Sequence, residues 1–218
     1  MEAIGPDPRS KGARAPFGRW QEVTIIASGP SLTRDDCERV REWRDAGGGR
    51  AVIVVNLSFR LARWADVLYA ADVEWWRQHH LEALQFQGEK WTCTGEPARI
   101  HGINRCEARF GQGLCRDPRY LNTGGNSGYQ AINLAYHFGA RRIILIGYDM
   151  QHTGGLKHWH SDYPEGMDNA TPVASWRRRF EPLARDLKHD GVRVINATRQ
   201  TALECFERMP LEDALCGH

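Results

Sequence analysis

The sequence contains no long hydrophobic run. Its apolar stretches all fall short of the roughly 20 residues that a membrane-spanning helix requires, and no apolar segment with a cleavage site stands near the start of the chain. The cysteines form no Cys-x-x-Cys pair, and a site built from Cys106, Cys115 and a histidine would lack the spacing of a zinc finger or knuckle. We therefore expect a cytoplasmic protein with free thiols and no membrane span.

The chain also lacks a strong charge of either sign. Its formal net charge of +2 is too small to predict nucleic-acid binding by itself. The one tight basic cluster, residues 177–179, fits either the solvated face of a helix or a site for phosphate or a partner. No Gly-x-x-x-x-Gly-Lys motif is present, so any ATP would be held differently from ATP in P-loop kinases.

The length and composition predict one folded domain with a short arm. A chain of 218 residues with 41% hydrophobic residues is long enough to bury a substantial core. Residues 1–20 are rich in Gly, Pro, Arg and Lys and lack apolar periodicity, which predicts a flexible N-terminal arm. Residues 21–218 are predicted to form the folded domain.

Strand and helix patterns alternate along that domain. Short unbroken apolar runs predict buried strands, and apolar residues at helical spacing predict the helices between them. The predicted strands are residues 23–27, 51–55, 67–69, 142–147 and 192–196, with weaker candidates at 90–94 and 99–103. The predicted helices begin near Thr33 and cover residues 73–84, 127–138 and 174–189, with a short helical tail at the C-terminus. This order predicts an α/β fold with a Rossmann-like, doubly wound, mostly parallel sheet and helices on both faces.

Two loops of small residues stand where such a sheet would bind a ligand. Residues 122–128 read Asn-Thr-Gly-Gly-Asn-Ser-Gly before an amphipathic helix, and residues 28–31 read Ser-Gly-Pro-Ser after an apolar strand. Backbone N–H groups at a helix start, together with the helix dipole, attract anions such as phosphate. Because ligands of open α/β sheets lie at the carboxyl ends of the strands, the two loops predict one shared nucleotide cleft.

These segments also resemble a known family. Residues 25–32, Asn56 at a strand end, and residues 127–149 are similar to the CMP-sialic-acid-dependent bacterial sialyltransferases of glycosyltransferase family forty-two. They also resemble a sister group that contains the archaeal 6-hydroxymethylpterin pyrophosphokinases and small proteins of phage and prophage genomes. The resemblance covers about residues 23–215. It implies that the nucleotide-binding residues are Ser28, Gly29, Pro30, Ser31, Asn56, Asn126, Ser127 and Gly128.

The chain departs from the sialyltransferase pattern at two places. Ser28 stands where that family has an asparagine, and no histidine lies between Asn169 and Trp176, where the family has its general base. A polar loop after the strand at residues 142–147 offers substitutes. His158 or His160 could act as the base, with Asp149 as a further catalytic residue, while Lys157 and Tyr163 could bind phosphate oxygens.

Other interpretations of these residues remain open. The same loop could hold a divalent metal such as Mg²⁺, through ligands at Asp149, His158, His160 and Asp162, or it could be structural. Asp72 could bind nucleotide or could cap the helix that follows it. Asn196 has the character of a turn residue, and Trp159 is the tryptophan that lies inside the histidine loop.

The sequence therefore predicts a nucleotide-dependent transferase. The first hypothesis is a glycosyltransferase that uses a CMP-type nucleotide-sugar donor and a histidine base, with a small molecule, a glycan or a modified DNA base as acceptor. The second is a metal-dependent pyrophosphokinase that acts on a small alcohol. The third is a non-catalytic nucleotide-binding module of phage origin, because related sheets host unrelated chemistry.

Overall fold

The computed structural model describes residues 18–160 and 173–217. An eight-stranded sheet has the order β10-β9-β8-β1-β2-β3-β4-β5, and all its strand pairs are parallel. Its strands are β1 (Glu22–Ile26), β2 (Arg50–Val55), β3 (Val67–Tyr69), β4 (Glu89–Thr92), β5 (Asn104–Arg105), β8 (Arg142–Ile146), β9 (Arg193–Asn196) and β10 (Glu207–Arg208). The predicted α/β fold with a doubly wound parallel sheet is confirmed.

Strand β1 lies at the centre of the sheet, where the chain order reverses. Its Val23 pairs with Ala51 of β2 on one side and with Ile143 of β8 on the other. All three side chains are fully buried, which explains why these strands read as unbroken apolar runs in the sequence. Loops that leave β1 and β8 in opposite directions open a crevice between them, and this crevice is where ligands of such folds bind.

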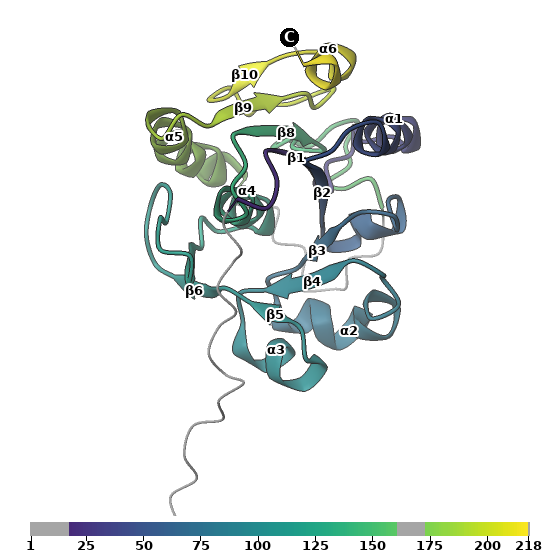
Figure 1. Ribbon diagram of the computed structural model, residues 1–218, viewed down its shortest axis with the longest axis vertical. Helices are drawn as coiled ribbons and strands as arrows, with labels where there is room; N and C mark the ends of the chain where they lie inside the picture. The colour runs from purple at the N-terminus through teal and green to yellow at the C-terminus, as the bar shows by residue number, and fades with distance from the viewer. Residues whose placement is uncertain (1–17, 161–172, 218) are drawn as a thin grey trace, which may run out of the picture.

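Helices cover both faces of the sheet (Figure 1). On one face, α4 (Ser127–His137) and α5 (Val173–His189) pack their apolar residues against the sheet in one buried cluster. On the other face, α1 (Arg34–Asp45), α2 (Val73–Ala83) and α6 (Leu211–Cys216) form a second cluster. The remaining elements are η2 (Asn56–Arg60), α3 (Gly95–His101) and the two-stranded parallel sheet of β6 (Glu107–Arg109) and β7 (Tyr120–Asn122).

The start of α1 follows the sequence prediction. Thr33 is the N-cap, and its hydroxyl accepts a hydrogen bond from Asp36 N–H at 3.2 Å. The Asp36 carboxylate accepts the Thr33 N–H in return at 3.0 Å, which completes a capping box. The helix therefore begins directly after the β1 loop and fixes where that loop ends.

Two parts of the sequence prediction were wrong. Residues 99–103 were expected to form a strand, but Arg99 lies in the helix α3, and the neighbouring strand β5 begins only at Asn104. The C-terminal tail contains the short strand β10 before its helix. Both elements are only a few residues long, so they carry too little periodicity to be recognised.

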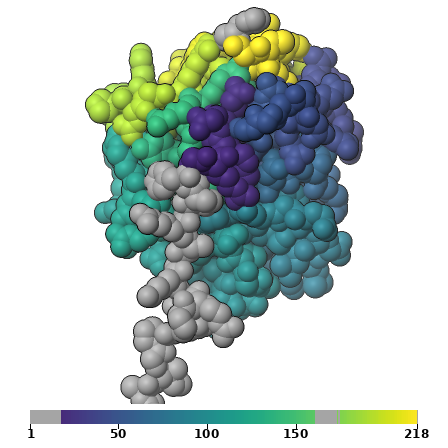
Figure 2. Space-filling model, in the orientation of Figure 1, coloured from purple at the N-terminus to yellow at the C-terminus, as the bar shows by residue number. Residues whose placement is uncertain are grey.

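The packed domain also begins earlier than residue 21. Arg19 N–H donates to Phe138 O at 2.8 Å, and the Trp20 ring meets the Phe138 ring edge-on at 5.1 Å. In Figure 2 the first described residues, in purple, lie against the green segment of the surface. Residues 18–20 therefore belong to the domain, whereas the rest of the predicted arm lies outside the described residues.

All six cysteines are free, as expected. Within the described ranges, no helix is both long enough and apolar enough to cross a bilayer.

Candidate functional site

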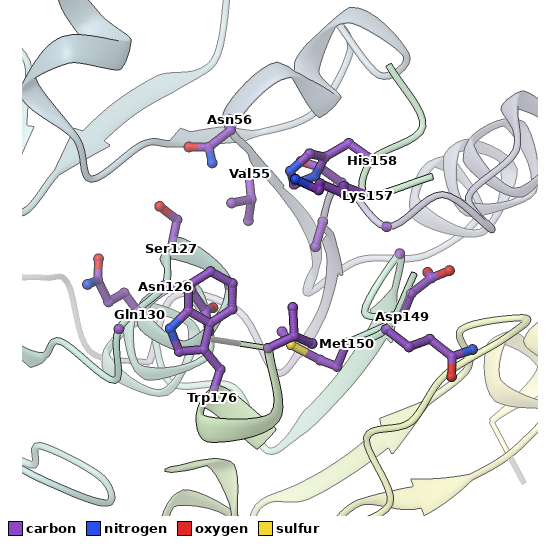
Figure 3. Close-up of a pocket in the computed structure, with 18 of the residues that line it drawn as sticks. Val55, Asn56, Asn126, Ser127, Gln130, Asp149, Met150, Lys157, His158 and Trp176 are labelled. Atoms are coloured by element: carbon purple, nitrogen blue, oxygen red, sulfur yellow. The ribbon is translucent and has the colours of Figure 1, made fainter. Parts of the chain in front are cut away.

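A pocket of about 360 Å³ lies at the carboxyl edge of the sheet. It is formed by the loops after β1, β2, β3 and β8 together with the first turns of α4 and α5 (Figure 3). The predicted site residues that line it are Ser28, Gly29, Asn56, Asp72, Asn126, Ser127, Gly128, Asp149, Lys157 and His158. The structure thus brings the two small-residue loops and the histidine loop to one cavity.

The loops after β1 and β8 are held together tightly. Gly29 N–H donates to Gly147 O at 2.7 Å, and Ser31 donates its N–H and its hydroxyl to the two oxygens of Asp149 at 2.9 and 2.8 Å. A Cβ on Gly29 would lie 2.1 Å from Asp149 Oδ1, so only glycine fits at this crossing. Pro30 and Ser31 share this loop but stand outside the lining of the pocket.

Asp149 is buried and its carboxylate is engaged with the protein. Besides Ser31, Thr153 donates its hydroxyl to Asp149 Oδ2 at 2.7 Å. Burial raises the pKa of Asp149, and the hydrogen bonds from Thr153 and Ser31 oppose that rise. These contacts make Asp149 a positioning residue for both loops, and its catalytic role remains a prediction.

The first turn of α4 forms a second wall. Asn126 is the N-cap, and its Oδ1 accepts the Tyr129 N–H at 2.8 Å, while its Nδ2 has no partner in the part of the chain that the structure describes. Ser127 is buried and lines the pocket. Gly128 is packed close to Tyr148, whose hydroxyl donates to Gly128 O at 2.9 Å. This turn presents polar groups and the positive end of a helix dipole to the pocket.

Two strand ends contribute the polar groups opposite. Asn56 follows β2 in a left-handed conformation, with a φ of 51°. Asp72 follows β3 at the N-cap position of α2, but its side chain makes no capping hydrogen bond. The Asp72 side chain is exposed, but it faces the cavity and not bulk water. The surrounding protein desolvates its carboxyl group, and this raises the pKa of Asp72. The predicted capping role is therefore wrong for the side chain.

The histidine loop approaches from the β8 side. His158 and Lys157 line the pocket, and Figure 3 shows them on the opposite side from Trp176. The His160 ring is stacked on the His158 ring at 5.5 Å but does not itself line the cavity. Of the two histidines predicted as base, His158 is thus the one placed at the pocket.

Trp159 anchors this loop to the sheet. Its N–H donates to Ser28 O at 3.2 Å, and its indole Nε1 donates to the Ser58 hydroxyl at 3.3 Å. Ser58 is fully buried and donates in turn to Ala27 O at 2.9 Å. Ser58 stands in the polar segment at the end of the second strand, but its contacts could not be predicted because its partners come from distant positions in the chain.

The predicted metal ligands are only partly visible. Asp162, one of the predicted ligands, lies outside the described residues, as does Tyr163, which was predicted to bind phosphate. Within residues 18–160 and 173–217, no group of three or more His, Cys, Asp or Glu side chains is placed to hold a metal ion. Mg²⁺ binding therefore stays a prediction that involves residues beyond those described.

Sequence reasoning missed several residues of the pocket. These are Val55, Ala71, Gln130, Met150, Gln151 and Trp176, among others. Gln130 is buried between the pocket and the core, where its Oε1 accepts the Tyr69 hydroxyl at 2.6 Å and its Nε2 donates to Thr123 O at 2.8 Å. Periodicity alone marks such residues only as one face of a helix.

Asn196 has a structural role. Its Nδ2 donates to Leu203 O at 3.0 Å, and its Oδ1 accepts the Thr198 N–H at 3.2 Å. These two bonds hold the turn after β9, as the sequence predicted for a turn residue.

Comparison with known proteins does not assign this chain to a family. No protein-family model matches the sequence, and no curated protein is significantly similar to it.

Proposed function

We propose that this protein binds a nucleotide in the pocket and transfers a group from it, with glycosyl transfer from a CMP-type nucleotide sugar as the first reaction to test. The observation that carries the proposal is the convergence, at the sheet's switch point, of the α4 N-terminus, the Gly29 loop and His158 on one cavity. A crevice of this kind is where doubly wound sheets bind nucleotides.

The phosphate would lie against the first turn of α4. Ser127 offers a hydroxyl at the wall of the cavity, and Asn126 offers an Nδ2 that has no partner among the described residues. Both are neutral donors, and the helix dipole adds a favourable field for an anion. Lys157, on the facing loop, supplies a cationic side chain at the same cavity.

The size of the cavity favours a mononucleotide unit. Its volume of about 360 Å³ is near the lower end of the roughly 300–1,000 Å³ range of ligand pockets. An extended dinucleotide such as NAD would need more room than a nucleotide monophosphate with one attached sugar. The pocket is therefore better suited to the proposed donor than to a dinucleotide cofactor.

His158 would act as the general base. In the proposed reaction its imidazole takes the proton of an acceptor hydroxyl, and the acceptor oxygen forms a bond to the anomeric carbon of the donor sugar. The bond between that carbon and the phosphate oxygen breaks, and nucleoside monophosphate leaves with the electron pair. A positioned histidine suits this step, because its pKa lies close to neutral pH.

The proposal is tested first by binding. Calorimetric titrations with CMP, CDP, UDP, GDP, ATP and AMP, each with and without magnesium, are expected to show metal-independent binding of CMP or another nucleotide. Ser127→Leu should abolish binding, because the new side chain fills the wall of the cavity, while Ser127→Ala should only weaken it. Unchanged affinity in Ser127→Leu would contradict the site.

Turnover is the second test. Release of nucleoside monophosphate from a panel of nucleotide sugars, with the acceptor classes supplied in turn, would support transfer. Binding of ATP or AMP only with magnesium would favour the pyrophosphokinase hypothesis instead. Nucleotide binding without turnover over the whole panel would favour a non-catalytic module.

A further inference from the structure

The apolar face of α5 extends beyond the core of the protein. Phe180, Leu183 and Leu187 recur at helical spacing and are buried against the sheet. Trp176 precedes Phe180 by one turn and continues the same face. At this position the core has ended, and the indole lines the pocket instead.

The loop before α4 is shaped to admit this indole. Gly125 has a φ of 87°, and a Cβ there would lie 3.0 Å from Trp176 Nε1 and 2.2 Å from Arg179 Nη1. Arg179 also donates to Gly124 O at 3.4 Å, so the first turns of α5 are joined to the loop that begins α4. The indole thus occupies a defined place beside the proposed phosphate position.

Two apolar side chains line the cavity together with the indole. Met150, from the loop after β8, and Val55, at the end of β2, line the same cavity. Figure 3 shows the indole reaching into the pocket between Met150 and the first turn of α4, with Val55 beyond it. A planar ring could pack against these three side chains, while Asn56, Asp72 and the α4 turn supply polar groups to the same cavity.

We infer that Trp176 is the stacking platform for the base of the bound nucleotide. The inference rests on the proposed function and adds the orientation of the ligand, with the base against α5 and the phosphate against α4. The indole is partly buried against the Gly125 loop, and its remaining surface lines the cavity. Base stacking on tryptophan is favourable for every base because each has a π face.

The test compares ligands with and without a base. Wild type, Trp176→Leu and Trp176→Phe are titrated with CMP, AMP, ribose 5-phosphate and inorganic phosphate by calorimetry. Trp176→Leu is expected to weaken CMP and AMP roughly 5- to 140-fold, the range that corresponds to one stacked base. Affinity for the two ligands without a base should change less than about twofold, and Trp176→Phe should keep most of the nucleotide affinity.

Fluorescence gives an independent readout. Nucleotide should quench the emission of the wild type, and the part of this quenching that belongs to Trp176 should be missing in Trp176→Phe. Nucleotide binding that is unchanged in Trp176→Leu would overturn the stacking inference and leave the proposed function intact. Equal losses for ligands with and without a base would also overturn it. A wild type that binds no nucleotide would overturn the proposed function itself.

Discussion

Ser31 and Asp149 form a two-point contact across the centre of the sheet. The Ser31 hydroxyl lies 2.8 Å from Asp149 Oδ1, and its backbone nitrogen lies 2.9 Å from Asp149 Oδ2. One residue follows β1 and the other follows β8, so this contact sets the distance between the two loops that flank the pocket.

Replacing Asp149 by Asn should loosen this contact. An amide keeps one oxygen acceptor, but its N–H₂ group would face a donor group of Ser31 or Thr153. At least one of these donors would then lose its acceptor. We expect a loss of about 1–3 kcal/mol in the free energy of unfolding, measured by urea denaturation. Asp35→Asn is the control, because its ion pair with Arg39 is on the surface and should contribute less than about 1 kcal/mol. Equal effects of the two substitutions would contradict the role of Asp149.

Gly29→Ala tests the close approach of the same loops. The added methyl group would lie 2.1 Å from Asp149 Oδ1 and 2.5 Å from Gly147 O, and the backbone oxygen cannot move away cheaply. We expect destabilisation of about 1–3 kcal/mol from overpacking, together with weaker ligand binding. Gly48→Ala is the matched control, since a Cβ there meets nothing within 4 Å and its φ is not in the left-handed region. A wild-type melting temperature for Gly29→Ala would show that the loops are not fixed as described.

Gly125→Ala should displace the indole of Trp176. The substitution combines an unfavourable φ of 87° with contacts to Trp176 and Arg179. Gly191→Ala separates the two effects, because Gly191 has a φ of 73° but open space around its Cβ position. We expect both variants to lose stability, whereas only Gly125→Ala should lose nucleotide affinity in calorimetry. Similar affinities for the two variants would argue against a ligand beside Gly125.

His158→Asn and His160→Asn should differ in catalysis. His158 lines the pocket, while His160 supports it through ring stacking. Loss of a general base lowers turnover typically by 10²–10⁴-fold, so we expect a loss of about that size for His158→Asn, with donor affinity nearly unchanged. His160→Asn should retain most of the rate. The measurement is the release of nucleoside monophosphate, and a larger effect at His160 would reverse the assignment.

The contact between Arg116 and Asp190 should make stability depend on pH. Arg116 donates to both Asp190 oxygens at 2.8 and 2.9 Å, and Tyr136 donates its hydroxyl at 2.9 Å. The hydrogen bond from Arg116, ahead of the other causes, lowers the pKa of Asp190 well below its usual value. The stabilisation is therefore present above about pH 4 and is lost as the pH falls toward the folded-state pKa.

Urea unfolding of wild type and Asp190→Asn at pH 6 and pH 3 measures this effect. Because the pair is partly exposed, the two proteins should differ by about 1 kcal/mol or less at pH 6, and the difference should narrow at pH 3. A difference that grows as the pH is lowered would contradict the sign.

The sequence predicted the parts of this protein whose signal is local. The strands β1, β2 and β8 are short apolar runs, and the cap of α1 is complete within Thr33 and Asp36. The helix α3 was mistaken for a strand, because it covers only seven residues and has one buried residue, Pro97. Without an apolar face, a short helix leaves no periodic pattern.

The difference between local and distant signals also explains which site residues could be predicted. Ser28, Gly29 and the first turn of α4 could be predicted because they stand at the ends of recognisable elements. The sequence also places Ser58 near a strand end, but the contacts of Ser58 and Trp176 could not be predicted, because they are made with loops far away in the sequence. Ser58 meets Trp159 across 101 positions, and no local pattern carries such a contact.

The distance in sequence between Ser31 and Asp149 has a consequence for folding. The two residues are 118 positions apart, so the pocket between their loops cannot exist until β1 has paired with strands from both halves of the chain. Contacts of such long range form slowly, because the chain must close a large loop before they can stabilise it. A ligand of this pocket would then act on the completed sheet alone. It would raise the melting temperature of the whole domain and would leave partly folded chains unprotected.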